Sequence, residues 1–291
     1  DLVESKRDPE LWKKCDVRNS EELVAVCSGV DVIVNLAAAH RDDVRPISLY
    51  YETNVDGARC VCQAAMQCGV RRIVFTSSVA IYGFPEYEYD EDGPKHPFND
   101  YGKSKLEAEA VYQEWLNAAP ENRLQVVRPT AIFGEGNRGN IYNLFHQLAR
   151  RRFLMIGNGK NKKSIAYVGN VAAFLKWYIE ADPAKYKVCN FIDKPDLDMY
   201  DLVALFEKDF RRKVTLPVTL PYWLGLLGGY GFDVLAWVLH RSLPISSIRI
   251  RKFCAQSIFS TRRLEETGFI PPFTIEEGIR RTIAFEFSPK E

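Results

Sequence analysis

The sequence has almost no net charge and few of the features that mark a metal site or a disulfide framework. Its 39 Lys and Arg side chains are balanced by 38 Asp and Glu side chains, which excludes the broad basic surface that a nucleic-acid-binding protein needs. The cysteines form no Cys-x-x-Cys pair, and none of the 4 histidines stands at metal-ligand spacing. We therefore predict a protein of the reducing cytoplasm with no metal and no nucleic-acid partner.

A secretory signal peptide is also missing from the start of the chain. The first residues are Asp1, Leu2 and Val3 rather than an initiator Met. We therefore expect the natural N-terminus to lie upstream of Asp1.

With 291 residues, the chain is long enough for a nucleotide-binding α/β domain and a smaller appended lobe.

Long apolar runs are scarce, and the longest, residues 216–239, is interrupted by Asp233, four glycines and two prolines. A membrane-spanning helix needs about 20 apolar residues, so the length suffices but the interruptions argue against spanning. A core helix or a helix that packs between lobes is the first interpretation. A surface that lies against a membrane or a lipid tail remains open as the alternative.

Strand and helix patterns alternate over the first 130 residues or so. Continuous apolar runs of strand length are typical of parallel strands buried on both faces, and helical patterns separate them. Gly69 and Pro129 are expected to end a helix and a strand, respectively. The predicted strands are residues 32–38, 72–77 and 124–128, and the predicted helices are residues 54–69 and 101–117. The alternation predicts an α/β fold with a Rossmann-type doubly wound parallel sheet.

The pattern changes after about residue 130. Loops rich in Gly and Asn occur at residues 134–140 and 157–161, with a helical stretch between them. Such loops are typical of a substrate lobe at the carboxyl ends of the strands. We predict a nucleotide-binding domain over residues 1–133 and a smaller C-terminal substrate lobe over residues 134–291, from which some segments return to the first domain.

The segment that carries the clearest chemistry is Tyr101-Gly102-Lys103-Ser104-Lys105. One helical turn separates Tyr101 from Lys105, so both side chains point the same way. An ammonium beside a phenol favours the phenolate, which lowers the pKa of the phenol toward the range of a general base. Ser78, at the end of a preceding strand, can bond the substrate oxygen. The set predicts hydride transfer at a secondary alcohol.

Taken together with Thr76-Ser77-Ser78 and Arg128-Pro129, this segment resembles the extended short-chain dehydrogenase/reductase family, the NAD-dependent epimerases and dehydratases. The resemblance covers essentially the whole chain. It implies NAD as the cofactor and a homodimer that pairs through the two predicted helices. The Gly-x-x-Gly-x-x-Gly turn of this family has no counterpart here, which implies that roughly 30 residues, one βα unit, precede Asp1.

The resemblance also assigns roles to individual residues. It makes Tyr101, Lys105 and Ser78 the catalytic residues, with Tyr82 open between a sugar contact and a packing role. The implied NAD contacts are Asp1, Asp16, Val17, Leu36, Ala37, Ala38, Asn54, Tyr101, Lys105 and Arg128. The implied substrate contacts are Ser78, Tyr82, Asn140 and Lys163.

Residues 79–80 separate two activities of the family. Dehydratases carry an Asp-Glu pair just after the Ser or Thr, whereas this sequence has Val79 and Ala80, neither of which can move a proton. A 4-epimerase needs no additional acid or base, because it oxidises C4 to a keto sugar and reduces it on the other face. We therefore predict an isomerase, a sugar 4-epimerase.

Several stretches, among them residues 132–140 and 163–170, are similar to bacterial 4-epimerases that act on N-acetylglucosamine carried on undecaprenyl diphosphate, in O-antigen and related lipopolysaccharide assembly. This implies a sugar diphosphate substrate and a place at the cytoplasmic face of the plasma membrane, to which residues 216–239 and nearby basic clusters would bind. A UDP-sugar 4-epimerase, a sugar reductase that uses NAD(P) and a non-catalytic NAD-binding protein remain alternatives.

Overall fold

The computed structural model describes residues 1–41, 44–181, 184–210, 219–241, 243 and 246–287. The chain divides into two compact units. Unit 1 consists of Asp1–Gly83, Glu91–Pro129 and Phe174–Phe191, and unit 2 consists of Phe84–Asp90, Thr130–Ala173 and Ile192–Glu291. The main boundary therefore follows Pro129 rather than residue 133, and Phe84–Asp90 is an excursion that the sequence did not predict.

Unit 1 is built on a parallel sheet in the order β1-β2-β3-β7. The strands are β1 (Ile33–Asn35), β2 (Arg72–Thr76), β3 (Arg123–Pro129) and β7 (Tyr186–Phe191). This confirms the predicted α/β fold with a parallel sheet. Pro129 ends β3 but still belongs to it, opposite Phe191 of β7.

The helices of unit 1 begin and end at residues suited to those positions. They are η1 (Pro9–Leu11), α1 (Ser20–Cys27), α2 (Ser48–Tyr51), the π-helical η2 (Glu52–Asp56), α3 (Gly57–Cys68), η3 (Val79–Tyr82) and α4 (Asp100–Ala118). Asn99 caps the start of α4, and Gly69 ends α3 at a φ of 72°, where glycine avoids the strain that a Cβ would cause.

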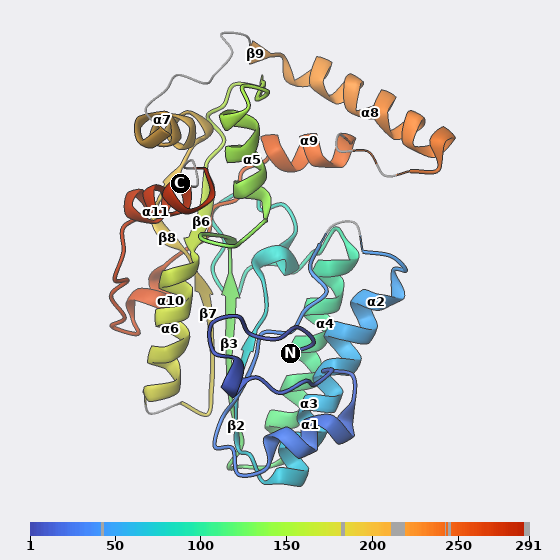
Figure 1. Ribbon diagram of the computed structural model, residues 1–291, viewed down its shortest axis with the longest axis vertical. Helices are drawn as coiled ribbons and strands as arrows, with labels where there is room; N and C mark the ends of the chain where they lie inside the picture. Colours follow the sequence, from blue (N-terminus) through green and yellow to red (C-terminus); the bar gives the residue numbers. More distant parts are fainter. Residues whose placement is uncertain (42–43, 182–183, 211–218, 242, 244–245, 288–291) are drawn as a thin grey trace. The chain divides into compact units, whose positions relative to one another are not determined.

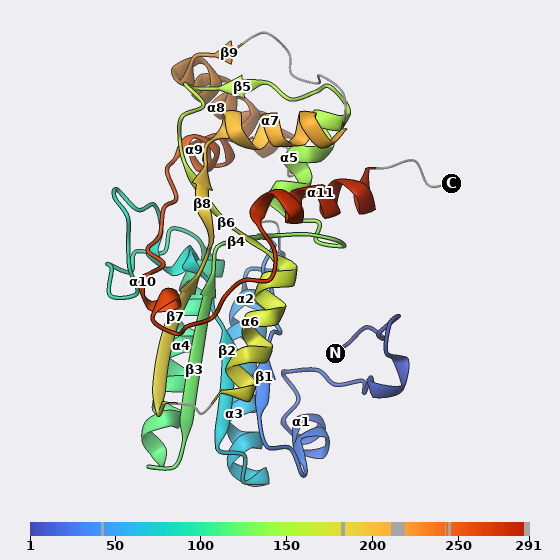
Figure 2. The same cartoon turned by 90° about the vertical axis from the view of Figure 1, so that its left-hand side faces the viewer.

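Helices cover both faces of this sheet (Figures 1 and 2). On one face, Ile73, Phe75 and Val126 pack with α3 and α4 in a continuous apolar core. On the other face, Phe174, from the second half of α6 (Val168–Glu180), packs against Phe191, and the centroids of the two rings are 5.1 Å apart. Successive residues of a strand point to opposite faces, so strands with apolar residues at consecutive positions can fill both cores.

The first strand is shorter and less buried than predicted. The apolar run at residues 32–38 forms a strand only over Ile33–Asn35, in which Ile33 and Val34 are half-buried. Leu36, just after the strand, is exposed. Among the described residues β1 and β7 are the two edge strands of the sheet, and burial of β1 on both faces stays a prediction.

Unit 2 combines small sheets with helices. Its strands are β4 (Ala131–Phe133), β5 (Met155–Ile156), β6 (Lys163–Tyr167), β8 (Asp193–Leu197) and β9 (Thr219–Leu220). Besides the first part of α6, its helices are α5 (Asn140–Ala149), α7 (Met199–Phe210), α8 (Tyr222–Leu239), α9 (Ser247–Cys254), α10 (Arg262–Glu265) and α11 (Ile275–Glu286). A core of its own, which includes Phe145, Phe206 and Ile279, holds these elements together.

Helix α8 corrects the first interpretation of residues 216–239, of which residues 216–218 lie outside the described residues. Only Gly225 and Gly229 of this helix are buried, so it is not a core helix. Trp223, Leu227 and Trp237 are among its many exposed side chains. In the part of the chain that the structure describes, α8 is the one helix long and apolar enough to cross a membrane.

Two cations are buried inside unit 1, and one carboxylate serves both. Arg128 donates from Nε and Nη2 to the carboxylate of Glu109 at 2.8 and 2.7 Å, and from Nη1 to the hydroxyl of Tyr82 at 2.7 Å. Glu109 also raises the pKa of Lys105, the second cation, against the effect of burial. A buried cation without its carboxylate is strongly destabilising, so the fold depends on Glu109.

We predict that Glu109→Gln lowers the free energy of unfolding by about 3 kcal/mol, because it leaves Arg128 buried and uncompensated. The measurement is urea denaturation at pH 7, with Glu107→Gln as the matched control, because Glu107 is an exposed residue of the same helix. Equal stability of the two variants would contradict the role given to Glu109.

Candidate active site

The start of α4 fixes the positions of Tyr101 and Lys105. The side chain of Asn99 accepts a hydrogen bond from the backbone N of Gly102 at 2.9 Å, which closes the first turn. Tyr101 lies in this turn, and Lys105 lies one turn further along.

Gly102 allows the start of α4 to lie directly against the turn that carries Ser78. A Cβ at Gly102 would come within 2.6 Å of the carbonyl oxygen of Ala80. Ser78 begins that turn, η3, and its hydroxyl accepts a hydrogen bond from the backbone N of Ala80 at 3.2 Å. The absence of a side chain at residue 102 therefore keeps the turn of Ser78 against the first turn of α4.

Asn54 ties this arrangement to the segment that follows β1. It lies in the π-helical η2, a rare geometry that is frequent at functional sites. Its amide accepts a hydrogen bond from the backbone N of Ala39 at 2.9 Å and donates to the hydroxyl of Ser104 at 2.8 Å. Ser104 in turn donates to the carbonyl oxygen of Tyr101 at 3.0 Å. Asn54 thus acts by positioning backbone and helix.

Lys105 is buried, with 1% of its surface exposed. Its Nζ lies 4.2 Å from the centre of the Phe75 ring, at the end of β2. Burial lowers the pKa of Lys105 to about 7, and Glu109 offsets only part of this effect. Near neutral pH the amine is therefore close to half protonated. It can stabilise a neighbouring anion only in its protonated form.

Arg128, predicted to contact NAD, and Tyr82, left open between a sugar contact and packing, both form hydrogen bonds with other protein groups. The hydroxyl of Tyr82 donates to Asn190 Oδ1 at 2.9 Å and accepts from Arg128. Arg128 also donates to the carbonyl oxygen of Glu91 at 3.0 Å. Both side chains are buried and bonded to the protein, so for Tyr82 the structure favours the packing role that the sequence left open.

Three residues near the start of the chain, Asp1, Asp16 and Val17, were predicted to lie around the adenosine half of NAD. Their burial and their partners differ. Asp1 is exposed, and its predicted place at the end of a strand stays a prediction. Asp16 forms an ion pair with Arg18 at 2.6 Å, and the hydrogen bond from Arg18 lowers the pKa of Asp16. Val17 packs against the core of unit 1.

The carboxyl ends of β1 and β2 meet at one edge of the sheet, because Asn35 pairs with Phe75. Leu36 and Ala37 are exposed there. At the end of β2, the buried hydroxyl oxygens of Thr76, its last residue, and of Ser77 have no hydrogen-bond partner among the described residues. Buried hydroxyls normally have partners, so a polar ligand at this edge would satisfy them. The residues present fit the nicotinamide half of a dinucleotide; the family's glycine-rich pyrophosphate turn has no counterpart in the sequence.

The two substrate residues predicted in unit 2 differ in accessibility. Asn140 is the exposed first residue of α5. Lys163 donates from Nζ to the carbonyl oxygen of Lys252 at 2.8 Å and to that of Ala255, which ties β6 to the end of α9. Burial lowers the pKa of Lys163 to about 8. The structure therefore favours a helix-holding role for Lys163 over the predicted diphosphate contact.

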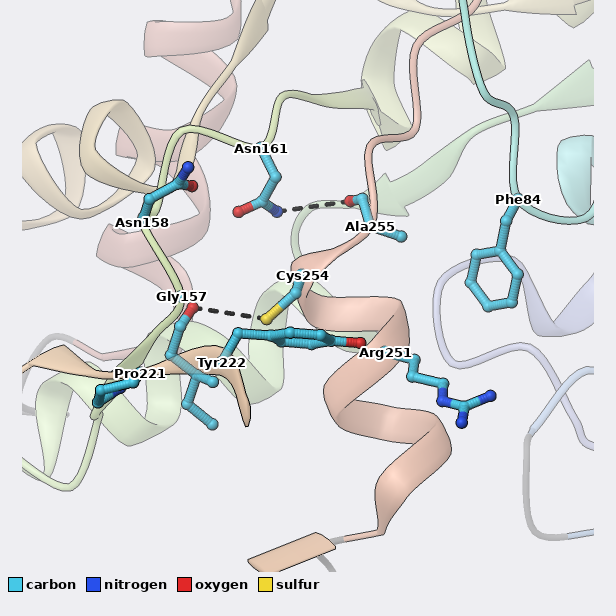
Figure 3. Close-up of a pocket in the computed structure, with 10 residues that line it drawn as sticks. Phe84, Gly157, Asn158, Asn161, Pro221, Tyr222, Arg251, Cys254 and Ala255 are labelled. Atoms are coloured by element: carbon cyan, nitrogen blue, oxygen red, sulfur yellow. Dashed lines mark hydrogen bonds between the residues drawn. The ribbon is translucent and has the colours of Figure 1, made fainter. Parts of the chain in front are cut away.

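A cavity of about 730 Å³ lies within unit 2. Figure 3 shows Tyr222 beside Cys254 and the guanidinium of Arg251 extending toward the side on which Phe84 lies. The residues that line this cavity are Phe84, Ile156, Gly157, Asn158, Asn161, Pro221, Tyr222, Arg251, Cys254 and Ala255. The lining offers one cation, no carboxylate and several apolar surfaces. Neither Asn140 nor Lys163 lines it, and the sequence did not predict it.

Sequence reasoning missed three residues on which the candidate site depends, namely Gly102, Ser104 and Glu109. Glu109 follows Lys105 by four residues, just as Lys105 follows Tyr101. This spacing places the carboxylate on the same face of the helix as the amine, so the sequence could have indicated Glu109. Gly102 and Ser104 lie inside the Tyr-x-x-x-Lys segment, but the contacts that join them to Ala80 and Asn54 are with residues distant in sequence. No group of three or more His, Cys, Asp or Glu side chains that could hold a metal ion occurs among the described residues.

Comparison with known proteins decides the family. The family model described as the NAD dependent epimerase/dehydratase family matches residues 3–190. The chain belongs to this family. It is 48% identical over 280 residues to the N-acetyl-alpha-D-glucosaminyl-diphospho-ditrans,octacis-undecaprenol 4-epimerase of Escherichia coli O157:H7, across 96% of this chain and 84% of that protein. It is 26% identical to the UDP-glucose 4-epimerase of Vibrio cholerae, across 96% and 83%.

Solved structures agree with the fold. The UDP-glucuronic acid 4-epimerase from Bacillus cereus in complex with NAD superposes with a TM-score of 0.75 at 15% identity, covering 96% of this chain and 83% of that one. The UDP-glucose 4-epimerase from Thermotoga maritima gives 0.73 at 18% identity, covering 94% and 84%. The family predicted from the Tyr-x-x-x-Lys segment is thus confirmed.

The buried amine of Lys105 generates a stability prediction. We expect Lys105→Met to raise the free energy of unfolding at pH 7 by about 2 kcal/mol, because a site arranged for function is often destabilising. The pKa of Lys105 is about 7 in the folded protein, below its ordinary value of 10.5. The cost of burying the charged amine is therefore present in full below pH 7. The gain should therefore shrink as pH rises from 7 toward 10.5. Urea denaturation at several pH values measures it.

The control for this prediction is Lys103→Met, which replaces an exposed lysine in the same turn of the helix. A Lys105→Met protein that is less stable than the wild type at pH 6 would show that the folded state retains the charge without penalty.

Proposed function

We propose that this protein is an NAD-dependent 4-epimerase of N-acetylglucosamine carried on undecaprenyl diphosphate, in the assembly of O-antigen or a related cell-surface polysaccharide. The observation that carries the proposal is the 48% identity, over 96% of the chain, to an enzyme of that name. The start of α4 supports it, because Tyr101, Lys105 and Ser78 come from elements that are held in direct contact.

In the proposed reaction the phenolate of Tyr101 removes the proton of the sugar's O4 and later returns it. Protonated Lys105 stabilises the phenolate, and the Ser78 hydroxyl bonds O4. The chemistry that bound NAD supplies is the reversible acceptance of a hydride. The residues proposed to hold it are Asp16, Val17, Leu36, Ala37, Ala38, Thr76, Ser77, Tyr101 and Lys105, and Asn54 acts through Ala39.

The residues that follow Ser78 support epimerisation over elimination. Val79 and Ala80 form the first half of η3, and neither side chain can donate or accept a proton. Epimerisation returns the O4 proton through the same phenol that removed it, so Tyr101 suffices for both half-reactions. A dehydratase would need an acid and a base where Val79 and Ala80 stand.

The cavity of unit 2 supports a diphosphate joined to an apolar carrier. Arg251 gives it one cation for an anionic group, and Phe84, Ile156 and Tyr222 provide apolar surface. Asn140, exposed at the start of α5, is proposed as a second contact of the diphosphate, since helix starts favour anions.

We propose that the protein works at the cytoplasmic face of the plasma membrane, where it would reach the undecaprenyl diphosphate carrier. It also includes a homodimer that pairs through α3 and α4. The apolar side chain of Met66 is exposed on α3 and would be covered in such a pair.

A UDP-sugar 4-epimerase is the second candidate, favoured by the similarity to the Vibrio cholerae enzyme. The full-length protein should be incubated separately with N-acetylglucosaminyl diphosphoundecaprenol in detergent and with UDP-N-acetylglucosamine, and the configuration at C4 of each product determined. We expect inversion of the lipid-linked sugar alone. Turnover of the UDP-sugar without turnover of the lipid-linked sugar would establish the second candidate instead.

Tyr101→Phe tests the catalytic assignment. We expect turnover to fall by about 1000-fold, because the variant keeps the ring but loses the group that carries the proton. NAD that copurifies with the protein, measured after its release, should be unchanged. The matched control is Tyr87→Phe, which alters an exposed tyrosine. Normal turnover by Tyr101→Phe would exclude this residue as the general base.

A further inference from the structure

Helix α8 exposes a row of large apolar side chains. Trp223, Leu227, Tyr230, Val234 and Trp237 follow one another at steps of four and three residues, which places them on one face of the helix. Their exposed fractions are 67%, 62%, 45%, 63% and 77%. We call these five residues the outer stripe. Contiguous apolar patches on a protein surface usually mark a site of interaction.

The opposite side of α8 is fixed to the rest of unit 2 by two glycines. A Cβ at Gly225 would lie 2.6 Å from Cγ2 of Ile156 in β5, and one at Gly229 would lie 2.8 Å from the Cα of Ser247 in α9. Small residues at such positions let backbones approach closely. Figure 1 shows α8 and α9 side by side. The helix is therefore held along its length as part of a folded unit.

The one carboxylate of α8 is directed toward α9. Asp233 accepts a hydrogen bond from the backbone N of Ser247 at 3.2 Å. Ser247 is the first residue of α9, where a negative charge is favourable. Asp233 therefore breaks the apolar run of α8, but its charge faces α9 and not the outer stripe.

The surroundings of the outer stripe are basic. Residues 222–256 contain Arg241, Arg249, Arg251 and Lys252 against Asp233 alone. Arg251 donates a hydrogen bond to the hydroxyl of Tyr230, so a cation lies at the edge of the stripe. Apolar and aromatic side chains flanked by Arg and Lys match a bilayer surface that carries anionic lipids.

We propose that α8 lies in the plane of an anionic phospholipid surface, with the outer stripe among the acyl chains and the arginines of α9 at the phosphates. The choice of a bilayer rests on the proposed lipid-linked substrate. Crossing the bilayer is disfavoured, because the helix would have to leave Ile156, Ser247 and Ile250 or draw them into the hydrocarbon. The outer stripe docks the protein onto the leaflet that holds its substrate.

Vesicle sedimentation of the full-length protein tests this docking. Wild-type protein should sediment with vesicles of phosphatidylcholine and phosphatidylglycerol and remain in solution with phosphatidylcholine alone. Leu227→Glu with Trp237→Glu should weaken binding on the order of 100-fold by removing apolar area. The matched control is Ile270→Glu with Phe285→Glu, two exposed apolar residues of unit 2 outside α8.

Charge and depth provide two independent measurements. Arg249→Glu should weaken binding to the anionic vesicles on the order of tenfold, whereas Lys208→Glu, which alters an exposed lysine of α7, should not. With bilayer-embedded bromolipids, variants that keep Trp223 or Trp237 as the single tryptophan, the other four being replaced by Phe, should be quenched at equal, shallow depth. A variant whose single tryptophan is introduced by Tyr230→Trp, and which is quenched much deeper than both, would indicate a spanning helix and overturn the proposal.

Three further outcomes would also overturn it. The first is wild-type protein that sediments with neither vesicle, and the second is a Leu227→Glu, Trp237→Glu protein that binds like the wild type. The third is conversion of a dimer to a monomer in solution by that variant, which would show that a second copy covers the stripe. The proposed function is tested separately by epimerisation in detergent. Vesicle binding without epimerisation would reject the function and keep the docking surface.

Discussion

Two buried cations that share one carboxylate are the constraint on which unit 1 depends. Glu109 gives both of its oxygens to Arg128, at 2.8 and 2.7 Å. Lys105 receives only part of the benefit of that charge, so burial dominates and brings the pKa of Lys105 to about 7. Burial thus brings the amine of Lys105, which is proposed to assist the reaction, to a half-charged state near pH 7, and Glu109, whose hydrogen bonds go to Arg128, offsets only part of this effect.

The catalytic segment could be predicted from the sequence because its spacing is local. Tyr101 and Lys105 are separated by one helical turn, and Asn99 supplies a recognisable cap for that helix. What the sequence could not show is how distant residues hold it. The bonds from Asn54 to Ala39 and Ser104 join residues far apart in the chain, and the fit of Gly102 against Ala80 depends on three-dimensional packing.

Contacts between distant residues also decide how the predicted ligand residues are held. Arg128, Tyr82 and Lys163 each bond to protein atoms far away in the sequence, and their predicted contacts with NAD and substrate stay predictions. The parallel strands were predictable from continuous apolar runs, but burial on both faces depends on the position of a strand in the sheet, which no local pattern records.

The exposure of α8 bears on which carrier the enzyme uses. Large apolar side chains on a surface promote aggregation, so a protein that meets its substrate in solution gains nothing from the outer stripe. A polyprenyl carrier is confined to a bilayer, and an enzyme bound to the same bilayer meets it at a raised effective concentration. The glycine face and Asp233 of α8 are fitted to α9, which leaves the outer stripe exposed as a consequence of folding. The proposed docking of α8 and the proposed lipid carrier therefore fit one another, and the experiments with vesicles and with the two sugar donors test them separately.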